Sequence, residues 1–367
     1  MPNIFIKQYF IYFLSKLGIF PKVNARLKFI KKSNLPKTME ITLMQMTYAG
    51  SKKAQKFIKS YLDNSIKLVK QGENNNKEGP VLLCAVKNDL KRVKLQLEHH
   101  RNIGIGNFIY IDNMSYDGTF EYLNMQTDVT LYRVDVPYNS TIRMGWWYQA
   151  INREGFNKWY LMLDSDELFA YPYMENVKIQ EYVDFLDHNN IKTTTTPLID
   201  MYNKNRIFNS TSDNDIKAEY CYFDNHYFKK RGYFNWQIHG GPRYRIFSLK
   251  NELTKHSLLK ADEETIICDH EIFPFSRNFD SSVNGFLLHY KFLKDDLEKY
   301  INIADKGHFS YGSSEYKTYI KHFSKNSDIS FITDKSQKYN NSLDLLKINI
   351  TDKNFFISMN NWVNNKK

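Results

Sequence analysis

The sequence contains little cysteine, and the few cysteines it has are widely separated. Cys84, Cys221 and Cys268 form no Cys-x-x-Cys pair. This pattern argues against a structural zinc site and a disulfide framework, and it indicates reduced thiols, as in the cytoplasm. The chain also lacks a glycine-rich phosphate loop of the P-loop kind. Because Cys84 lies inside an apolar run, residues 81–86, we expect it to be a small core residue.

The N-terminal region has no hydrophobic run long enough to predict a membrane span. Residues 4–20 are apolar and aromatic but are interrupted by Lys7, Gln8 and Lys16, whereas a spanning helix needs about 20 apolar residues. No basic residue precedes the run and no small-x-small cleavage site follows it, so we expect no secretory signal peptide.

Two interpretations of this N-terminal segment remain open. In the first, residues 1–32 form a helix in the membrane interface, with lysines on anionic headgroups. The protein would then be cytoplasmic and peripheral on the inner face of the cytoplasmic membrane. In the second, the helix packs on the protein's own surface.

Length and charge bound the remaining possibilities. A chain of 367 residues with 42% hydrophobic residues has room for one large or two ordinary domains with a packed core. The formal net charge of +11 favours anionic partners such as nucleotide sugars, phospholipid headgroups or nucleic acid, without choosing among them.

The chain divides into three parts. We predict an N-terminal helical segment at 1–78, an α/β domain at 79–293 and a C-terminal helical extension at 294–367. Within the first part, residues 39–70 are predicted to be helical, and residues 71–79 read as a polar linker.

The α/β domain begins with apolar runs that alternate with segments of helical periodicity. The pattern predicts a mostly parallel central sheet flanked by helices, with right-handed crossovers and a ligand crevice beyond the carboxyl ends of the strands. Lys87, Asn88, Asp112 and Asn113 occupy such positions. The predicted strands are residues 81–86, 108–112, 129–134, 160–163 and 193–199, and the predicted helices are residues 90–101, 120–125, 146–154, 295–306 and 313–323.

The strand at 160–163 delivers three acids, Asp164, Asp166 and Glu167, at its carboxyl end. Buried carboxylates need compensation, and Mg²⁺ or Mn²⁺ is a natural compensator because these ions prefer oxygen ligands and often hold substrate phosphates as well. The alternative is a surface turn in which Asp164 caps a helix that starts near Ser165. We expect Glu167 to brace the following turn rather than to bind metal.

Several ordered motifs resemble family-two glycosyltransferases with the GT-A fold, particularly a bacterial branch. They are the apolar strand followed by Lys87-Asn88-Asp89, Asp-Asn-Met-Ser-Tyr-Asp-Gly-Thr at 112–119, and Asp-Ser-Asp at 164–166. Leu-Ile-Asp-Met-Tyr at 198–202, Gly-Gly-Pro-Arg-Tyr-Arg-Ile-Phe at 240–247 and Leu-His-Tyr-Lys-Phe-Leu at 288–293 follow. The resemblance covers roughly residues 80–325 and implies a GT-A-like nucleotide-diphospho-sugar transferase fold.

The resemblance also implies a nucleotide-sugar site. Lys87 and Asn88 match positions beside the base, and Asp112 matches the acid that contacts the nucleoside, with Asn113 next to it. In the matching Asp-x-Asp pair, Asp166 meets the metal and Asp164 reaches the ribose or a metal-bound water. The chain departs from the family at position 89, where Glu is commoner, which weakens the implied contact beside the base.

Later motifs supply further candidates. His289 is our first choice to complete the metal shell and His270 the second, while Lys291 could face the diphosphate. Arg243 and Arg245 suit a diphosphate or an acidic acceptor, because one guanidinium group can donate two parallel hydrogen bonds to two oxygens of the same phosphate. The alternative is that one arginine pairs with the acidic cluster at the metal site or with the acids at 263–264.

An inverting transfer needs a base that takes the acceptor's proton. Asp200, after a β-branched run, and Glu271, in the segment Cys-Asp-His-Glu at 268–271, are both candidates. The sequence does not choose between them.

We therefore expect a metal-dependent inverting glycosyltransferase that uses Mn²⁺ or Mg²⁺. It would move a sugar from a nucleoside-diphosphate sugar to a saccharide or lipid-linked acceptor, in cell-surface polysaccharide or glycolipid synthesis, without a nucleic-acid partner. The alternatives are a nucleotidyltransferase that releases pyrophosphate, or a non-enzymatic basic protein that binds membrane or nucleic acid. The last leaves the acids at the strand ends unexplained.

Overall fold

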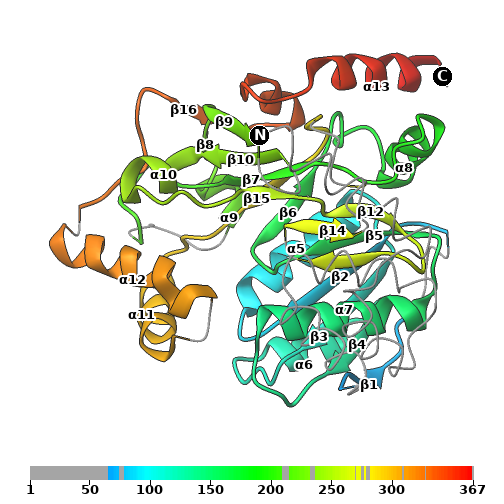
Figure 1. Cartoon of the computed structure of the whole chain (residues 1–367), viewed down its shortest axis with the longest axis horizontal. Coiled ribbons are helices and arrows are strands. Elements are labelled where there is room, and N and C mark those ends of the chain that lie inside the picture. Colours follow the sequence, from blue (N-terminus) through cyan, green and yellow to red (C-terminus); the bar gives the residue numbers. More distant parts are fainter. Residues whose placement is uncertain are drawn as a thin grey trace, which may run out of the picture.

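The computed structural model describes most of the chain from residue 65 onward. A mixed α/β fold with parallel and antiparallel strand pairs is confirmed (Figure 1). The described residues are 65–73, 78–208, 215–231, 236–268, 270–273, 277, 282–307, 310–326 and 328–365.

The larger sheet has six strands in the order β1-β4-β3-β2-β5-β12. The four inner strands run parallel, while β1 and β12 pair antiparallel at the two edges. The inner strands are almost wholly apolar, as expected for strands buried on both faces. Their bounds are β1 Lys67–Lys70, β2 Val81–Val86, β3 Asn107–Asp112, β4 Val129–Arg133, β5 Lys158–Leu163 and β12 Leu258–Ala261.

Helices cover both faces of this sheet because side chains alternate along each strand. Leu82 and Cys84 of β2 pack in one core cluster with α5 (Leu90–Asn102) and α6 (Thr119–Met125), so Cys84 is the core residue that the sequence predicts. Val81 and Leu83 pack in a second cluster with α7 (Ser140–Glu154).

The strand order reverses at β2. The chain passes from β2 to β3 and β4 on one side and then returns to place β5 on the other side of β2. In open α/β sheets, ligands bind beyond the carboxyl ends of the strands at such a switch point. The loops that follow β2 and β5 therefore mark the expected binding region.

The second sheet has four strands in the order β11-β7-β15-β6. Strand β15 lies between β7, to which it is parallel, and β6, to which it is antiparallel. His289 at the end of β15 is opposite Asp200 on one side and Glu167 on the other. The bounds are β6 Glu167–Ala170, β7 Thr196–Asp200, β11 Thr254–Lys255 and β15 Phe286–His289.

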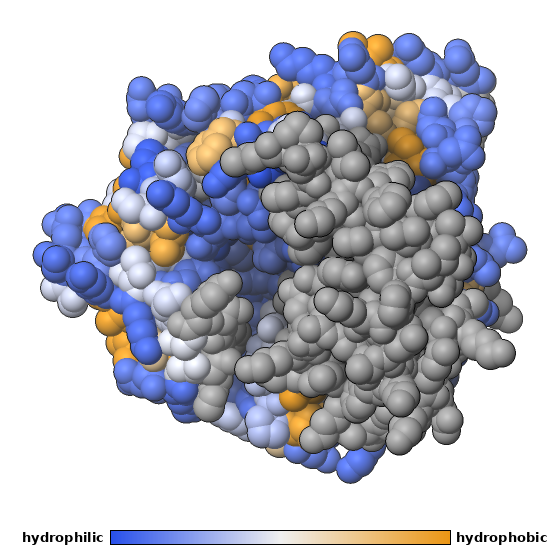
Figure 2. Space-filling view, in the orientation of Figure 1, coloured by the Kyte–Doolittle hydropathy of each residue, from blue (hydrophilic) through white to orange (hydrophobic). Residues whose placement is uncertain are grey.

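The C-terminal helices pack on the part of the molecule that carries the second sheet. Helices α11 and α12 lie side by side, away from the six-stranded sheet (Figure 1), and contribute Tyr300 and Tyr319 to an aromatic cluster with Phe247 and Phe292. In the same view the described surface is mainly hydrophilic, with scattered hydrophobic patches (Figure 2). The helices are α11 Asp296–Lys306, α12 Ser310–Lys325, the 3-10 helix η2 Ser342–Lys347 and α13 Lys353–Asn365.

The remaining elements are short. Strand β16 (Ser336–Lys338) from the C-terminal extension pairs with β8. The others are α8 Ile179–His188, α9 Ile216–Glu219, β8 Tyr222–Asp224, β9 Tyr227–Arg231, β10 Trp236–Gly240, α10 Gly241–Phe247, β13 Ile266–Cys268 and β14 Glu271–Phe273.

One predicted element is wrong where the structure describes it. The helix expected at 39–70 ends instead in strand β1, because Lys67–Lys70 gains antiparallel pairing with β4 at the sheet edge. Residues 39–64 and the N-terminal segment 1–32 lie outside the described residues. Within the described part, no helix is long and apolar enough to cross a membrane.

Candidate functional site

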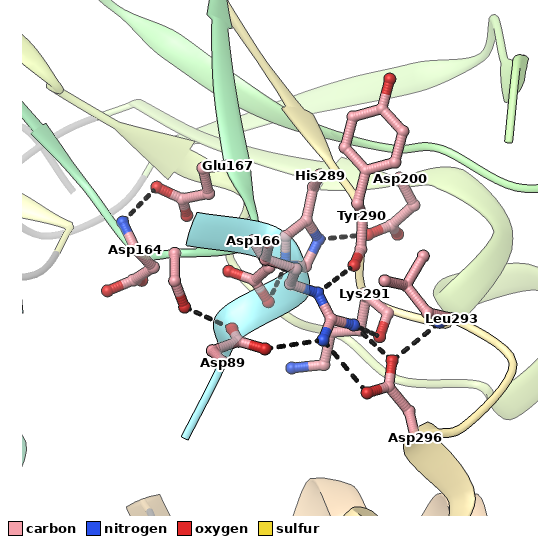
Figure 3. A network of polar contacts seen from close by, with 12 residues as sticks. Asp89, Asp164, Asp166, Glu167, Asp200, His289, Tyr290, Lys291, Leu293 and Asp296 are labelled. Carbon is pink, nitrogen blue, oxygen red and sulfur yellow. Dashed lines mark hydrogen bonds and ion pairs between the residues drawn. The ribbon is translucent and has the colours of Figure 1, made fainter. Parts of the chain in front are cut away.

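The predicted acids gather at the switch point of the large sheet. Asp89 follows β2, and the loop 164–166 follows β5. The Ser165 hydroxyl donates a hydrogen bond of 2.5 Å to Asp89 Oδ2. His289 reaches the same loop from the end of β15 (Figure 3). Residues far apart in the chain therefore meet where the topology predicts a ligand.

Asp164 belongs to a group that we call the lysine cluster: Asp164, Glu167, Lys255 and Arg143. Lys255 Nζ lies 2.6 Å from Asp164 Oδ2 and also donates to Glu167 Oε1. Arg143 donates to Asp164 Oδ1, and its guanidinium carbon lies 4.3 Å from the centre of the Trp147 ring. Fixed cations thus engage both oxygens of Asp164.

These cations set the ionisation of the lysine cluster. Burial alone raises the pKa of Asp164, but Arg143 and Lys255 outweigh burial and hold it below its usual value. Burial raises the pKa of Glu167 to about 7, partly opposed by Lys255. Asp164 is therefore a carboxylate at neutral pH.

Glu167 also shapes the acidic turn. Its Oε2 accepts a hydrogen bond of 3.0 Å from the backbone N–H of Asp164, so it braces the turn that precedes it, whereas a brace of the following turn was expected. No helix starts near Ser165, because β6 begins at Glu167. The interpretation of Asp164 as a helix cap is therefore wrong.

Asp166 belongs to a second group, the histidine cluster: Asp166, His289, Asp200 and Arg243. His289 Nδ1 lies 2.6 Å from Asp200 Oδ1, and His289 Nε2 lies 3.2 Å from Asp166 Oδ2. Arg243 Nε donates to Asp200 Oδ2 at 2.8 Å. The imidazole is thus held between two carboxylates; His289, Asp200 and Arg243 are buried, and Asp166 is partly exposed.

The charges of the histidine cluster depend on one another. Burial lowers the pKa of His289, but Asp166 and Asp200 outweigh burial and raise it. Burial raises the pKa of Asp166, but His289 and Lys291 outweigh it and hold that pKa well below its usual value. Both acids are ionised, so the imidazole edge faces negative charge.

The predicted metal ligands do not form a three-residue set. Among the described residues, no group of three or more His, Cys, Asp or Glu side chains is placed to hold a metal ion. Asp164 faces Arg143 and Lys255, whereas Asp166 and His289 contact each other.

The chemistry of the second pair nevertheless fits a divalent cation. A metal-binding histidine commonly donates its other ring N–H to a carboxylate, and Asp200 occupies that position on His289. Mg²⁺ typically uses one or two carboxylates and takes its remaining ligands from substrate phosphates and water. Asp166 and His289 would be the protein ligands of such a site.

The positions predicted to bind the nucleoside lie beyond β2 and β3. Lys87 is exposed. Asn88 joins the two loops, because its backbone N–H donates to Ser115 Oγ and its Oδ1 accepts from the Tyr116 N–H, each at 2.9 Å.

Asp112 and Asn113 each present a buried acceptor. Asp112 Oδ2 accepts from the Ser115 N–H, and Asn113 Nδ2 donates to two backbone carbonyls after β4. Asp112 Oδ1 and Asn113 Oδ1 have no hydrogen-bond partner within the part of the chain that the structure describes. Buried acceptors without partners are costly, and ligand N–H or O–H groups would satisfy them.

The two arginines of α10 both form ion pairs. Arg243 bonds Asp200 and also Glu315 Oε1 of α12 at 3.0 Å, so it forms ion pairs, but with other acids than those the alternative named. Arg245 makes two bonds to Asp224 of β8. Lys291 Nζ lies 3.6 Å from Glu315 Oε1.

Glycine is required where α10 begins. Gly240 has φ 128°, and a Cβ there would lie 2.9 Å from the His226 carbonyl oxygen. Only glycine tolerates both the backbone conformation and the close contact. The turn that presents Arg243 to Asp200 therefore depends on this position.

The two candidate bases lie in different elements. Asp200 ends β7 inside the histidine cluster. Glu271 lies in β14, opposite Cys268 of β13, and the neighbouring His270 Nδ1 contacts the Thr254 carbonyl at 2.7 Å. Of the two candidate bases, Asp200 is the one that belongs to the histidine cluster.

Four charged partners of these acids were not predicted from the sequence: Arg92, Arg143, Lys255 and Glu315. The Trp146-Trp147 pair was a local signal for Arg143, one helical turn earlier. Lys255 contacts an acid 91 residues away in sequence, a separation that leaves no local pattern.

Comparisons with known proteins yield little. No protein-family model and no curated protein matches the sequence. Among solved structures, the chain matches a mannosyltransferase from Pyrobaculum calidifontis in complex with GDP-Man and Mn²⁺, at 9% identity and a TM-score of 0.24. The match covers 42% of this chain and 47% of that one. At this score the function has to be argued from the residues of the chain itself.

Proposed function

We propose that the protein is a metal-dependent inverting glycosyltransferase that uses a nucleoside-diphosphate sugar. One observation carries the proposal: Asp166 Oδ2 and His289 Nε2 lie 3.2 Å apart beside the switch point of the sheet, with His289 Nδ1 bonded to Asp200. The sequence motifs that resemble family-two glycosyltransferases coincide with these residues. The location is the one at which α/β sheets bind nucleotides.

The residues of the histidine cluster and Lys291 would have separate roles. Asp166 and His289 would hold Mn²⁺ or Mg²⁺, and the ion when bound would stabilise negative charge on the departing diphosphate. Asp200 fixes the orientation and tautomer of the His289 ring. Lys291, whose pKa is raised chiefly by Glu315 in spite of burial, supplies a second positive charge near Asp166.

The nucleoside would lie beyond β3. The unpartnered Asp112 Oδ1 and Asn113 Oδ1 would accept hydrogen bonds from the base or ribose. Lys87 and Asn88 border the same loops.

The contacts of Asp200 favour a supporting role over that of the base. Both of its oxygens are bonded, one to His289 and one to Arg243. Burial raises the pKa of Asp200, but Arg243 and His289 together outweigh burial and lower it. A carboxylate stabilised in this way is a weak proton acceptor. We therefore favour Glu271 as the base that takes the acceptor's proton.

The proposed class of acceptor rests only on the resemblance to family-two glycosyltransferases. A saccharide or lipid-linked acceptor would place the enzyme in cell-surface polysaccharide or glycolipid synthesis. The basic N-terminal segment would then hold the protein peripherally on anionic membrane.

A donor screen tests the proposal. UDP-, GDP-, CMP- and dTDP-sugars are added to the protein with and without Mn²⁺, and both the melting temperature and the released nucleotide are measured. A donor at about 100 times its Kd should add about 2.7 kcal/mol of stability, and only with the metal. Release of pyrophosphate would support a nucleotidyltransferase instead, and no metal-dependent shift with any donor would sink the proposal.

A further inference from the structure

We propose that Arg92 is a positioning residue, which sets the place of His289 and Lys291 relative to Asp166. The inference rests on the proposed function for its catalytic consequence. Its structural part stands on contacts alone. Arg92 lies on α5, one turn after β2, and is 4% exposed.

Every N–H of the Arg92 guanidinium is used. Nε donates to the Tyr290 carbonyl at 2.8 Å, and Nη2 donates to the Lys291 carbonyl at 2.8 Å. Nη1 donates to Asp89 Oδ1 at 3.0 Å and to Asp296 Oδ1 at 3.1 Å, and Nη2 also bonds Asp296 Oδ2. An arginine has five N–H donors, and these five bonds account for all of them.

These bonds join the start of α5 to a single stretch about 200 residues later in the chain, which contains Tyr290, Lys291 and Asp296. Asp89 follows β2 and accepts from Ser165, the middle residue of the acidic loop. Asp296 begins α11. The Tyr290 and Lys291 carbonyls belong to the backbone directly after His289. Figure 3 shows Asp89, Tyr290, Lys291 and Asp296 close to one another, beside the histidine cluster.

Tyr290 is the link between Arg92 and the histidine cluster. Its N–H donates to the Asp166 backbone carbonyl at 2.8 Å, while its carbonyl accepts from Arg92 Nε. This backbone is therefore fixed to Asp166 through the Tyr290 N–H and to Arg92 through the Tyr290 and Lys291 carbonyls. Loss of Arg92 leaves the Tyr290 carbonyl without its Nε bond, whereas the Lys291 carbonyl keeps its bond from the Tyr300 hydroxyl.

Arginine is needed for this role because of its shape. A lysine keeps the charge but places its three donors on one atom, so it cannot reach two carboxylates and two carbonyls in different directions. A misplacement of about 1 Å in a catalytic group can lower the rate about 100-fold. Arg92 makes no hydrogen bond to the side chains of Asp166 or His289 among the described contacts, so its effect is on placement.

The experiment compares Arg92→Lys with Arg101→Lys on the same helix. Arg101 makes a similar two-point bond, to Asp128 at 2.8 and 2.6 Å, but joins neither cluster. Hydrogen exchange of the Tyr290 amide is measured in the protein without ligand, and kcat and KM are measured with the donor found in the screen.

Arg92→Lys should exchange the Tyr290 amide at least about tenfold faster than wild type. It should also lower kcat about 10- to 100-fold, the range seen when groups that orient metal ligands are lost, while the donor KM changes less than about threefold. Arg101→Lys should leave both the exchange and kcat at wild-type values. If Arg92→Lys does not fold, Asp296→Asn, which weakens the same anchor, should move both readouts in the same direction.

Two results would overturn the inference: wild-type exchange at Tyr290 in a folded Arg92→Lys protein, or faster exchange with an unchanged kcat. The failure of the proposed function looks different. In that case wild type turns over no donor, but Tyr290 still exchanges faster in Arg92→Lys than in Arg101→Lys.

Discussion

The lysine cluster and the histidine cluster each contain one acid of the same Asp-Ser-Asp segment, but the two acids have different partners. Asp164 and Asp166 are separated by one residue, yet Asp164 is neutralised by two permanent cations, whereas Asp166 meets an imidazole. Because Arg143 and Lys255 bond both oxygens of Asp164, these permanent cations leave no position on that carboxylate open to a metal ion. An imidazole nitrogen can give up its proton and bind a metal instead.

Within one loop, Asp164 would thus serve the stability of the fold, and Asp166 would serve the proposed reaction. Lys255 and Arg143 are bonded to the acids of this turn, and in the proposed function these ion pairs would stay in place. Asp166 and His289 form the pair that, in the proposed function, would exchange a proton for a divalent ion. The comparison therefore predicts that variants of the two clusters fail in different assays.

The largest effect is expected for Asp166→Ala. It should lower release of nucleoside diphosphate from donor plus acceptor by about 1000-fold or more, equivalent to about 4 kcal/mol of transition-state stabilisation. The fold should remain intact, because the Asp166 side chain is partly exposed and contacts chiefly His289. Turnover and circular dichroism are the measurements, and a folded variant with full activity would defeat the assignment.

Lys255→Met should act on stability instead. It leaves Asp164 and Glu167 without their shared cation in a buried site, which should lower the free energy of unfolding by about 3 kcal/mol. Lys260→Met is the matched control, because Lys260 pairs with Asp187 at a partly exposed position, and it should cost about 1 kcal/mol or less. Urea unfolding measures both, and equal losses would contradict the distinction.

His99, which contacts no carboxylate within the described residues, sharpens the contrast with His289. His99 is buried and bonded to the Phe169 carbonyl, and burial lowers its pKa to about 3, with Lys217 contributing. The unfolded chain therefore binds more protons than the folded protein below about pH 6.5, so stability should fall as pH falls. Between about pH 7 and pH 5 this histidine should cost about 2 kcal/mol.

His99→Gln tests that expectation. The glutamine amide can still donate to the Phe169 carbonyl but does not titrate, so the stability of the variant should depend less on pH over the same range. Urea unfolding at several pH values gives the slope. Parallel slopes for wild type and variant would show that His99 does not titrate as its burial requires.

The first half of the α/β domain could be predicted from sequence because its signals are local. Apolar runs at 81–86, 108–112 and 160–163 correspond to β2, β3 and β5 within one or two residues at each end. The acids that end these strands were found for the same reason. Strand β1 was missed because only its pairing with β4 distinguishes Lys67–Lys70 from the end of a helix.

The partners of those acids could not be predicted, because tertiary contacts choose them. Arg92 bonds Asp296 across 204 residues of sequence, and neither residue stands in an unusual local pattern. Arg243 was found, but its interaction with Asp200 rather than phosphate depends on how α10 packs against β7. Local chemistry thus locates the acids, and the packing of distant elements decides which cation each acid meets.

The register of β15 has a consequence for how the site could change. Glu167, His289 and Asp200 form one row across three adjacent strands, so the distance between strands, about 4.8 Å, sets their spacing. The connecting loops do not. Loops between these strands could be lengthened or exchanged to accept another substrate without altering the row, whereas a shift of β15 by one residue would turn His289 to the opposite face of the sheet.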